Sequence, residues 1–184
     1  MFTEDYILRM INQALAVLAR LAGLKAANRR QEARQAIDQA LEILLGLDAR
    51  LIRQLDDDGL LAALTVGGRL DAERLSVLAD ILAAEAELLA EDGLTAESRA
   101  ALLQALNFSI LAAWNRDAAS PPEADGRITA LYHRLGGPPL PEAAALQLED
   151  YCTHLADKSD QELTVAGLAR HEIEQILRAL RAGK

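Results

Sequence analysis

The sequence predicts an all-α protein built of antiparallel helix hairpins. Hydrophobic residues make up 51% of the 184 residues and aromatic residues only 3%, and most apolar residues are Ala and Leu, which favour helices. Apolar residues recur at intervals of three and four, the spacing of one helix face. No segment alternates apolar and polar residues as a half-buried strand does. A chain this rich in apolar residues is not expected to be disordered.

Turn-forming residues divide the chain into two predicted parts, 1–119 and 120–184. The boundary is the segment 120–126, where Ser, Pro and Gly interrupt the helical spacing. We expect the first part to be a helical-hairpin domain. The second is expected to be a small helical segment that is packed on the first part or linked to it.

The first predicted helix begins at Thr3, a favourable N-cap, and stops at Gly23. It carries two apolar stripes, which predicts packing on two sides. The main stripe consists of Ile7, Met10, Ile11, Ala14, Val17, Leu18 and Leu21. The second stripe, Leu8, Leu15 and Ala22, repeats every seven residues. We expect it to meet either the remaining helices or a second copy of the chain.

Glycine and aspartate bound the next three predicted helices, as helix stops and N-caps respectively. These are a helix over 26–45 ended by Gly46, a helix capped by Asp48 that reaches residue 55, and a helix over 60–66 capped by Asp57 or Asp58. Gly67 and Gly68 then break the chain.

The clearest prediction is a helix hairpin over 71–118. Asp71 caps its first helix, which ends at Gly93, and Thr95 caps its second helix. Because the connection is about two residues long, the two helices must pack antiparallel.

The C-terminal part is predicted to hold three helices. They are a helix over 127–135, a helix from Pro141 to about residue 157, and a last helix that the capping box Ser159–Glu162 opens and that reaches Leu180.

Two short patterns resemble the second helix of a tetratricopeptide hairpin, in which small and larger apolar residues recur at fixed offsets. They are Ala33, Ile37 and Ala40, and Ala101, Ala105 and Phe108. Residues 3–118, with the opening Asp5–Ile11 and the hairpin over 71–118, resemble an uncharacterised bacterial family of small helical proteins. The resemblance implies a tetratricopeptide-like helical fold and implies no activity.

The net charge of −9 is unevenly distributed. Residues 1–54 hold 8 basic and 6 acidic residues, residues 55–126 hold 4 and 14, and residues 127–184 hold 7 and 8. A partner that docks on the acidic middle part is therefore expected to be basic. Binding to nucleic acid or to an anionic membrane is not expected of a chain this acidic.

The sequence favours a cytoplasmic location. The opening residues are acidic, unlike those of a signal peptide, and no apolar stretch reaches the length of a membrane span. The single cysteine, Cys152, cannot form an internal disulfide, which is typical of a reducing compartment.

Few residues suggest chemistry. Cys152 and His154 lie on different faces of a helix and His171 lies in another helix, so no metal site and no cofactor are expected. One helix carries Asp80, Glu87 and Glu91 on a face expected to be solvated, and Glu85 at the edge of the apolar stripe, where partial burial is expected.

The basic cluster consists of Lys25, Arg29, Arg30 and Arg34. We expect a solvated face that pairs with the acidic middle part. Phosphate or nucleic-acid binding is the alternative.

The sequence contains no Walker loop, no Gly-x-Ser-x-Gly and no His-Glu-x-x-His. We therefore expect a non-catalytic helical protein that mediates protein–protein interaction or acts as a scaffold. The alternatives are a structural homo-oligomer and a helical protein that binds a small ligand between hairpins. The possible interaction surface consists of Leu8, Leu15, Ala22, Arg29, Arg30 and Arg34.

Overall fold

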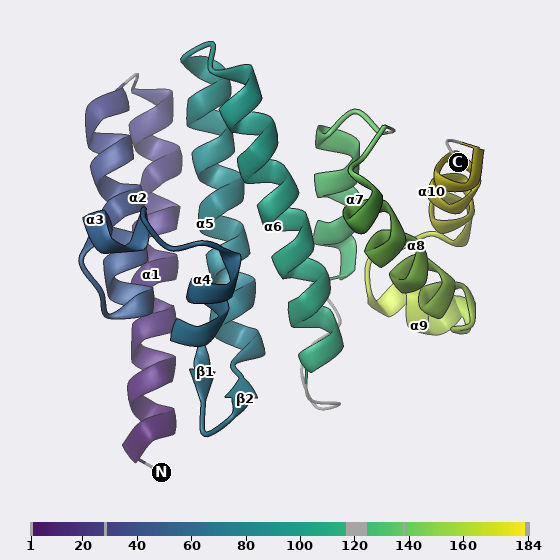
Figure 1. Cartoon of the computed structure of the whole chain (residues 1–184), viewed down its shortest axis with the longest axis horizontal. Helices are drawn as coiled ribbons and strands as arrows, with labels where there is room; N and C mark the ends of the chain where they lie inside the picture. Colours follow the sequence, from purple (N-terminus) through teal and green to yellow (C-terminus); the bar gives the residue numbers. More distant parts are fainter. Residues whose placement is uncertain (1, 28, 117–124, 138, 183–184) are drawn as a thin grey trace.

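The computed structural model describes residues 2–27, 29–116, 125–137 and 139–182, and the protein is all-α, as predicted (Figure 1). The described residues form ten helices and one pair of two-residue strands. In chain order these are α1 (Phe2–Ala26), α2 (Arg30–Leu45), α3 (Ala49–Ile52), α4 (Asp57–Ala63), β1 (Thr65–Val66), β2 (Arg69–Leu70), α5 (Ala72–Glu91), α6 (Thr95–Asn115), α7 (Asp125–Arg134), α8 (Glu142–Ala156), α9 (Asp160–Val165) and α10 (Arg170–Ala182).

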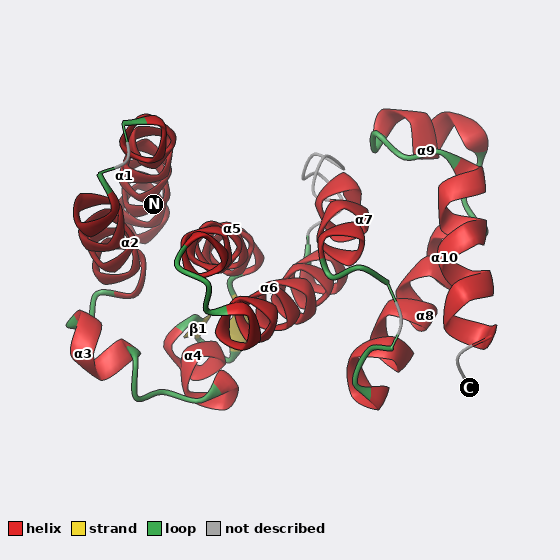
Figure 2. Ribbon diagram, turned by 90° about the horizontal axis from the view of Figure 1, so that it is seen from above, coloured by secondary structure: helices red, strands yellow, loops and turns green. Residues whose placement is uncertain are grey.

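The longer helices stand in a row that runs from α1 and α2 at one end to α10 at the other (Figures 1 and 2). Neighbours in the row pack on one another: α1 on α2, α2 on α5, α5 on α6, α6 on α7 and α8, and α8 on α10. The short helices α3 and α4 lie along one side of this row (Figure 2). A continuous apolar core connects the helices.

The predicted hairpin over 71–118 is confirmed as α5 and α6, which pack along their length. Small residues allow the close approach: Ala86 and Ala105 are fully buried between the helices. The buried hydroxyl of Ser98 donates to the carbonyl of Ala86 at 2.7 Å, which satisfies both polar groups.

A buried arginine joins this hairpin to α2. Arg74 is 6% exposed, and its Nε and Nη2 atoms donate to the carbonyl of Leu44 at 3.1 and 2.5 Å. The carbonyl belongs to the last turn of α2, whose acceptors have no partner inside the helix. Burial lowers the pKa of Arg74.

The first helix is longer than predicted at both ends. It begins at Phe2, so Thr3 lies inside the helix, and it continues through Gly23 to Ala26. A glycine inside a helix costs roughly 1 kcal/mol relative to alanine. Burial of Leu21 and Leu24 on either side of Gly23 offsets that cost. The second helix consequently begins at Arg30 rather than at residue 26.

The prediction of no strands is wrong for one turn. Strands β1 and β2 pair antiparallel, with Thr65 opposite Leu70. Gly67 and Gly68 connect them with φ values of 59° and 79°, as a two-residue hairpin turn with two positive φ angles requires. Two-residue strands are too short to produce an alternating pattern in the sequence.

Of the other predicted helix starts, two are confirmed and three differ by one or two positions. The side chains of Asp48 and Asp71 accept from backbone amides at the starts of α3 and α5, as predicted. Asp56, not Asp57 or Asp58, caps α4, which therefore spans 57–63 rather than 60–66. Leu94 and Pro141 are the N-caps of α6 and α8, so Thr95 is the first helical residue and Pro141 precedes its helix.

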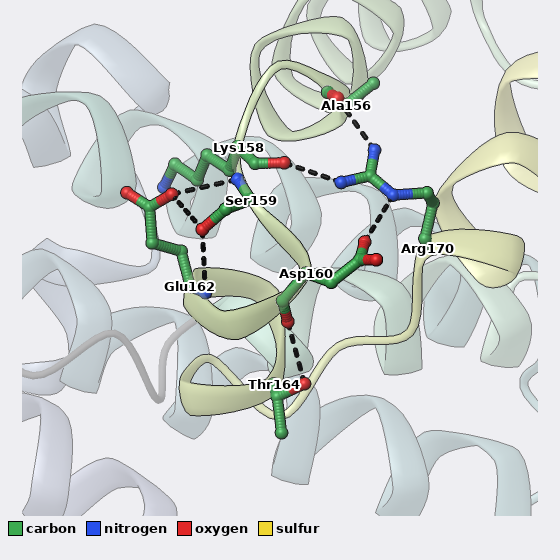
Figure 3. A network of polar contacts seen from close by, with 7 residues as sticks. All are labelled: Ala156, Lys158, Ser159, Asp160, Glu162, Thr164 and Arg170. Atoms are coloured by element: carbon green, nitrogen blue, oxygen red, sulfur yellow. Dashed lines mark hydrogen bonds and ion pairs between the residues drawn. The ribbon is translucent and has the colours of Figure 1, made fainter.

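The predicted last helix is two helices. The capping box of Ser159 and Glu162 is confirmed, but it opens the short α9, and Gly167 with a φ of 72° separates α9 from α10. Arg170 fixes the change of direction by donating to the carbonyls of Ala156 and Lys158 and to Asp160 (Figure 3). Its donors thus connect the end of α8 with the starts of α9 and α10.

Two arginines of α7 fasten the C-terminal part to α5. Arg127 forms an ion pair with Asp80 at 2.8 Å, and Arg134 forms one with Glu87 at 3.2 Å. The expectation of a solvated face was wrong for Asp80, which is partly buried against α7, whereas Glu87 is exposed, as expected, although it also binds α7. The predicted linker over 120–126 lies outside the described residues except for its last two residues, Asp125 and Gly126, which belong to α7.

Candidate functional site

The outer face of α1, defined here as Leu8, Asn12, Leu15 and Ala19, is exposed at one end of the row of helices. These residues follow one another at intervals of three and four, so they share one face of the helix. Leu8 is 49% exposed and Leu15 is 39% exposed. This face places two leucines in solvent on α1, one of the two helices at this end of the row.

The two predicted stripes of α1 have different environments. In the main stripe, Met10, Ile11, Ala14 and Leu21 are at most 8% exposed, which confirms that it packs on the neighbouring helices. The second stripe was expected to meet either the remaining helices or a second copy. Leu8 and Leu15 are 49% and 39% exposed, so the described helices do not bury this stripe as they bury the main one. The side chain of Ala22 lies outside the described residues.

The helix at the opposite end of the row, α10, exposes a polar face. On α10, Ile173, Ile176, Leu177 and Leu180 are at most 8% exposed and pack inward. The outer face of α10, defined here as His171, Glu174, Gln175, Arg178 and Arg181, is exposed. No large apolar side chain is exposed along Arg170–Ala182. The end helices of stacked helix pairs usually have a polar outer face. Helix α10 has such a face, whereas α1 exposes two leucines.

Two arginines of the basic cluster pair with the acidic middle part, as predicted. Arg30 and Arg34 both bind Asp92 at the end of α5, and Arg29 binds Glu32 one turn away. The three arginine side chains stay 53–57% exposed. These arginines already have partners within the chain. In the predicted interaction surface, Leu8 and Leu15 therefore remain as the exposed apolar residues. The side chain of Lys25 lies outside the described residues.

A cleft of about 550 Å³ lies between α2, the segment of α3 and α4, and the hairpin of α5 and α6. Leucine and alanine side chains form most of its wall: Leu41, Leu55, Leu60, Leu78, Leu82, Leu89, Ala100, Ala101 and Leu103, with Ile52. The polar residues that line it are Arg53, Asp57, Glu85, Gln104 and Asn107.

Arg53 organises one side of the cleft. Its guanidinium donates to Asp38 at 2.8 Å and to Oε1 of Glu85. Burial lowers the pKa of Arg53, but the hydrogen bonds and charges of Asp38 and Glu85 outweigh burial and raise it overall. The Glu85 side chain is 15% exposed, which confirms the predicted partial burial.

The other side of the cleft is formed by α6. Gln104 donates from Nε2 to Oδ1 of Asp57 at 2.6 Å, and Asn107 lies one turn further along the helix. The Oδ1 atom of Asn107 is buried and accepts no hydrogen bond from any described residue. Sequence reasoning missed this set, although two amides three residues apart among leucines and alanines in α6 are a signal that could have found it.

The predicted metal-ligand candidates remain separate. Within the described ranges, no three His, Cys, Asp or Glu side chains form a group that could hold a metal ion. Cys152 is buried, and burial raises the pKa of its thiol to about 12, so the thiol stays protonated at neutral pH. The ring of His154 lies 5.0 Å from that of the exposed Trp114.

Comparison of the chain with family models, with curated proteins and with solved structures finds no match. The resemblance to a bacterial family with a tetratricopeptide-like fold therefore stays a prediction. Among the helices of the described residues, none has the length and apolar character needed to cross a membrane.

Proposed function

We propose that this chain is a non-catalytic helical interaction protein that docks through the outer face of α1. The observation that supports the proposal is the difference between the two ends of the row of helices. Leu8 and Leu15 are exposed at the α1 end, whereas the α10 end exposes no large apolar side chain along Arg170–Ala182. An apolar stripe on a terminal helix is stabilised when a second helix covers it.

The spacing of the outer face suits a helix as the partner. Leu8 and Leu15 are seven residues apart, and Asn12 and Ala19 complete a seam with intervals of three and four. Two helices with such seams pack side chain between side chain. A second copy of this chain carries one such helix, so we propose self-association through α1 as the form of docking. A homo-oligomer with a purely structural role is the second candidate that the same face favours.

Light scattering across a dilution series tests the proposal. We expect a mass above that of the monomer at high concentration and the monomer mass after dilution. Leu15→Glu should remain monomeric throughout, because a second helix would bury its carboxylate without a partner.

Arg178→Glu on the outer face of α10 is the matched control. It also places a new carboxylate on a terminal helix and should leave the dilution series unchanged. A parent chain that is monomeric at every concentration, or a Leu15→Glu variant that associates as the parent does, would contradict the proposal.

A further inference from the structure

We propose that the cleft between α2, the segment of α3 and α4, and the hairpin of α5 and α6 binds an organic ammonium ion on an apolar stem. A free alkylamine and the side chain of a lysine share this chemistry. The site is separate from the outer face of α1, and the proposal does not depend on it.

The size and wall of the cleft suit the apolar stem. Its volume of about 550 Å³ falls within the roughly 300–1,000 Å³ that is typical of small-ligand sites. Leu78, Leu82 and Leu89 follow one another along the α5 side, and Leu103 lies on the α6 side. A linear hydrocarbon stem placed between them removes apolar surface from water, which is favourable.

The polar residues of the cleft select a cation. Arg53 is the one cationic side chain among the described lining residues, and Asp38 and Glu85 already neutralise it. Asp57 adds a further carboxylate, so acidic groups outnumber basic ones around the cleft. Arg53 donates to Oε1 of Glu85 and Gln104 donates to Oδ1 of Asp57, so the second oxygen of each carboxylate can accept from another donor. An ammonium supplies three donors and no acceptor.

Asn107 provides an independent observation. Its buried Oδ1 has no hydrogen-bond donor among the described residues, and such an atom costs free energy until a donor reaches it. Asn107 lines the same cleft as Glu85 and Asp57. The Asn107 side chain as a whole is only partly buried, so a turn of its amide toward the cleft brings Oδ1 within reach of a donor that enters there. A carboxylate ligand would instead meet the carboxylates of Glu85 and Asp57 and be repelled.

Titration of the ¹⁵N-labelled full chain, followed by amide chemical shifts, tests the proposal. The probes are hexylammonium, hexanol and hexanoate, which share one stem length and differ in the head group. We expect shifts centred on the cleft residues Leu82, Leu103 and Asn107. The Kd of hexylammonium should be at least tenfold lower than that of hexanol, and hexanoate should not bind. Equal binding of hexanol and hexylammonium, or shifts centred elsewhere, would overturn the proposal.

Two substitutions test the polar groups. Glu85→Gln and Asn107→Leu should each raise the Kd of hexylammonium at least fivefold. Glu73→Gln, on the same helix as Glu85 but outside the cleft, is the matched control and should leave the Kd unchanged. Circular dichroism checks that each variant folds, and Asp57→Asn replaces Glu85→Gln if that variant does not. Variants that fold and bind as the parent does would overturn the assignment.

Two capped peptides distinguish the sources of the ammonium. A Leu-Lys-Leu peptide that binds more tightly than hexylammonium, while its acetyl-lysine counterpart does not bind, identifies a lysine of a partner as the ligand. Tighter binding of hexylammonium identifies a free amine. If neither binds, the proposal is wrong.

Discussion

Two helices near opposite ends of the row, α1 and α10, bury their apolar residues to different extents. The apolar residues of α10 occupy one narrow stripe, and all four large ones are buried against the rest of the chain. Those of α1 occupy two stripes, and the neighbouring helices α2 and α5 cover only one. This exposed second stripe of α1 is the feature from which we propose a contact outside the chain.

The largest effect is expected on the inner side of α10. Ile176 is 1% exposed, so Ile176→Ala should lower the free energy of unfolding by about 2–5 kcal/mol, through lost burial and the cavity that remains. Urea denaturation measures the change. Gln175→Ala on the exposed side of the same helix is the control and should cost less than about 0.5 kcal/mol. Similar costs for both variants would mean that α10 does not pack as described.

A smaller effect is expected where α7 joins α5. Burial raises the pKa of Asp80, and the charge of Arg127 opposes that rise. Arg127→Ala should raise the pKa further and destabilise the fold at pH 7 by about 1 kcal/mol, as for partly exposed ion pairs. Because a raised carboxyl pKa means stability that is present at low pH and lost as pH rises, the penalty should shrink at pH 4.

Urea denaturation at pH 7 and pH 4 checks this prediction. Other carboxyl groups also titrate over that range, so the comparison uses the double variant Asp80→Asn with Arg127→Ala. In the Asp80→Asn background, the cost of Arg127→Ala should no longer depend on pH. A cost that is equal at both pH values in the parent background would refute the coupling.

The variant Leu15→Ala tests whether Leu15 stabilises the single chain or only its associated form. Because Leu15 is 39% exposed within the chain, the variant should lose less than about 1 kcal/mol under conditions where the protein is monomeric. The loss should grow with protein concentration, because the parent then gains stability from association. Thermal denaturation at several concentrations measures both. A loss of 2 kcal/mol or more at the lowest concentration, of the size expected for a core leucine, would place Leu15 inside the fold of a single chain.

The smallest effect is expected at the basic cluster. Arg29→Glu combined with Arg34→Glu should cost at most about 1 kcal/mol, because both side chains are more than half exposed. Thermal denaturation measures the change. A loss of several kcal/mol would show instead that the contact of Arg34 with Asp92 is needed to hold α2 on the hairpin of α5 and α6.

Helical periodicity and helix stops predicted most of the fold, and local signals of one or two residues produced the errors. The hairpin of α5 and α6 was predicted because its apolar spacing continues over many residues on either side of one glycine. Gly23 was misread as a stop because the burial of Leu21 and Leu24, which offsets its cost, is a tertiary effect. Gly167 was overlooked because the apolar spacing continues across the break.

For the candidate sites too, features within one helix were predictable from the sequence and features formed by several helices were not. The second stripe of α1 is visible in the sequence, because Leu8 and Leu15 share one helix. The cleft was missed because its polar residues come from three separate helices and one loop, and only folding brings Arg53, Glu85 and Asn107 together. Likewise, Asp80 was expected to be solvated because Arg127, its partner on α7, is far away in the sequence.

The most direct test of docking through α1 uses a spin label on one chain and ¹⁵N amides on another. In a Cys152→Ala background, Asn12→Cys carries the label on the outer face of α1, and Gln175→Cys carries it on the outer face of α10. In mixed samples, the label at position 12 should broaden α1 amides of the unlabelled chain, whereas the label at position 175 should broaden none. Absence of broadening from position 12, or stronger broadening from position 175, would contradict docking through α1.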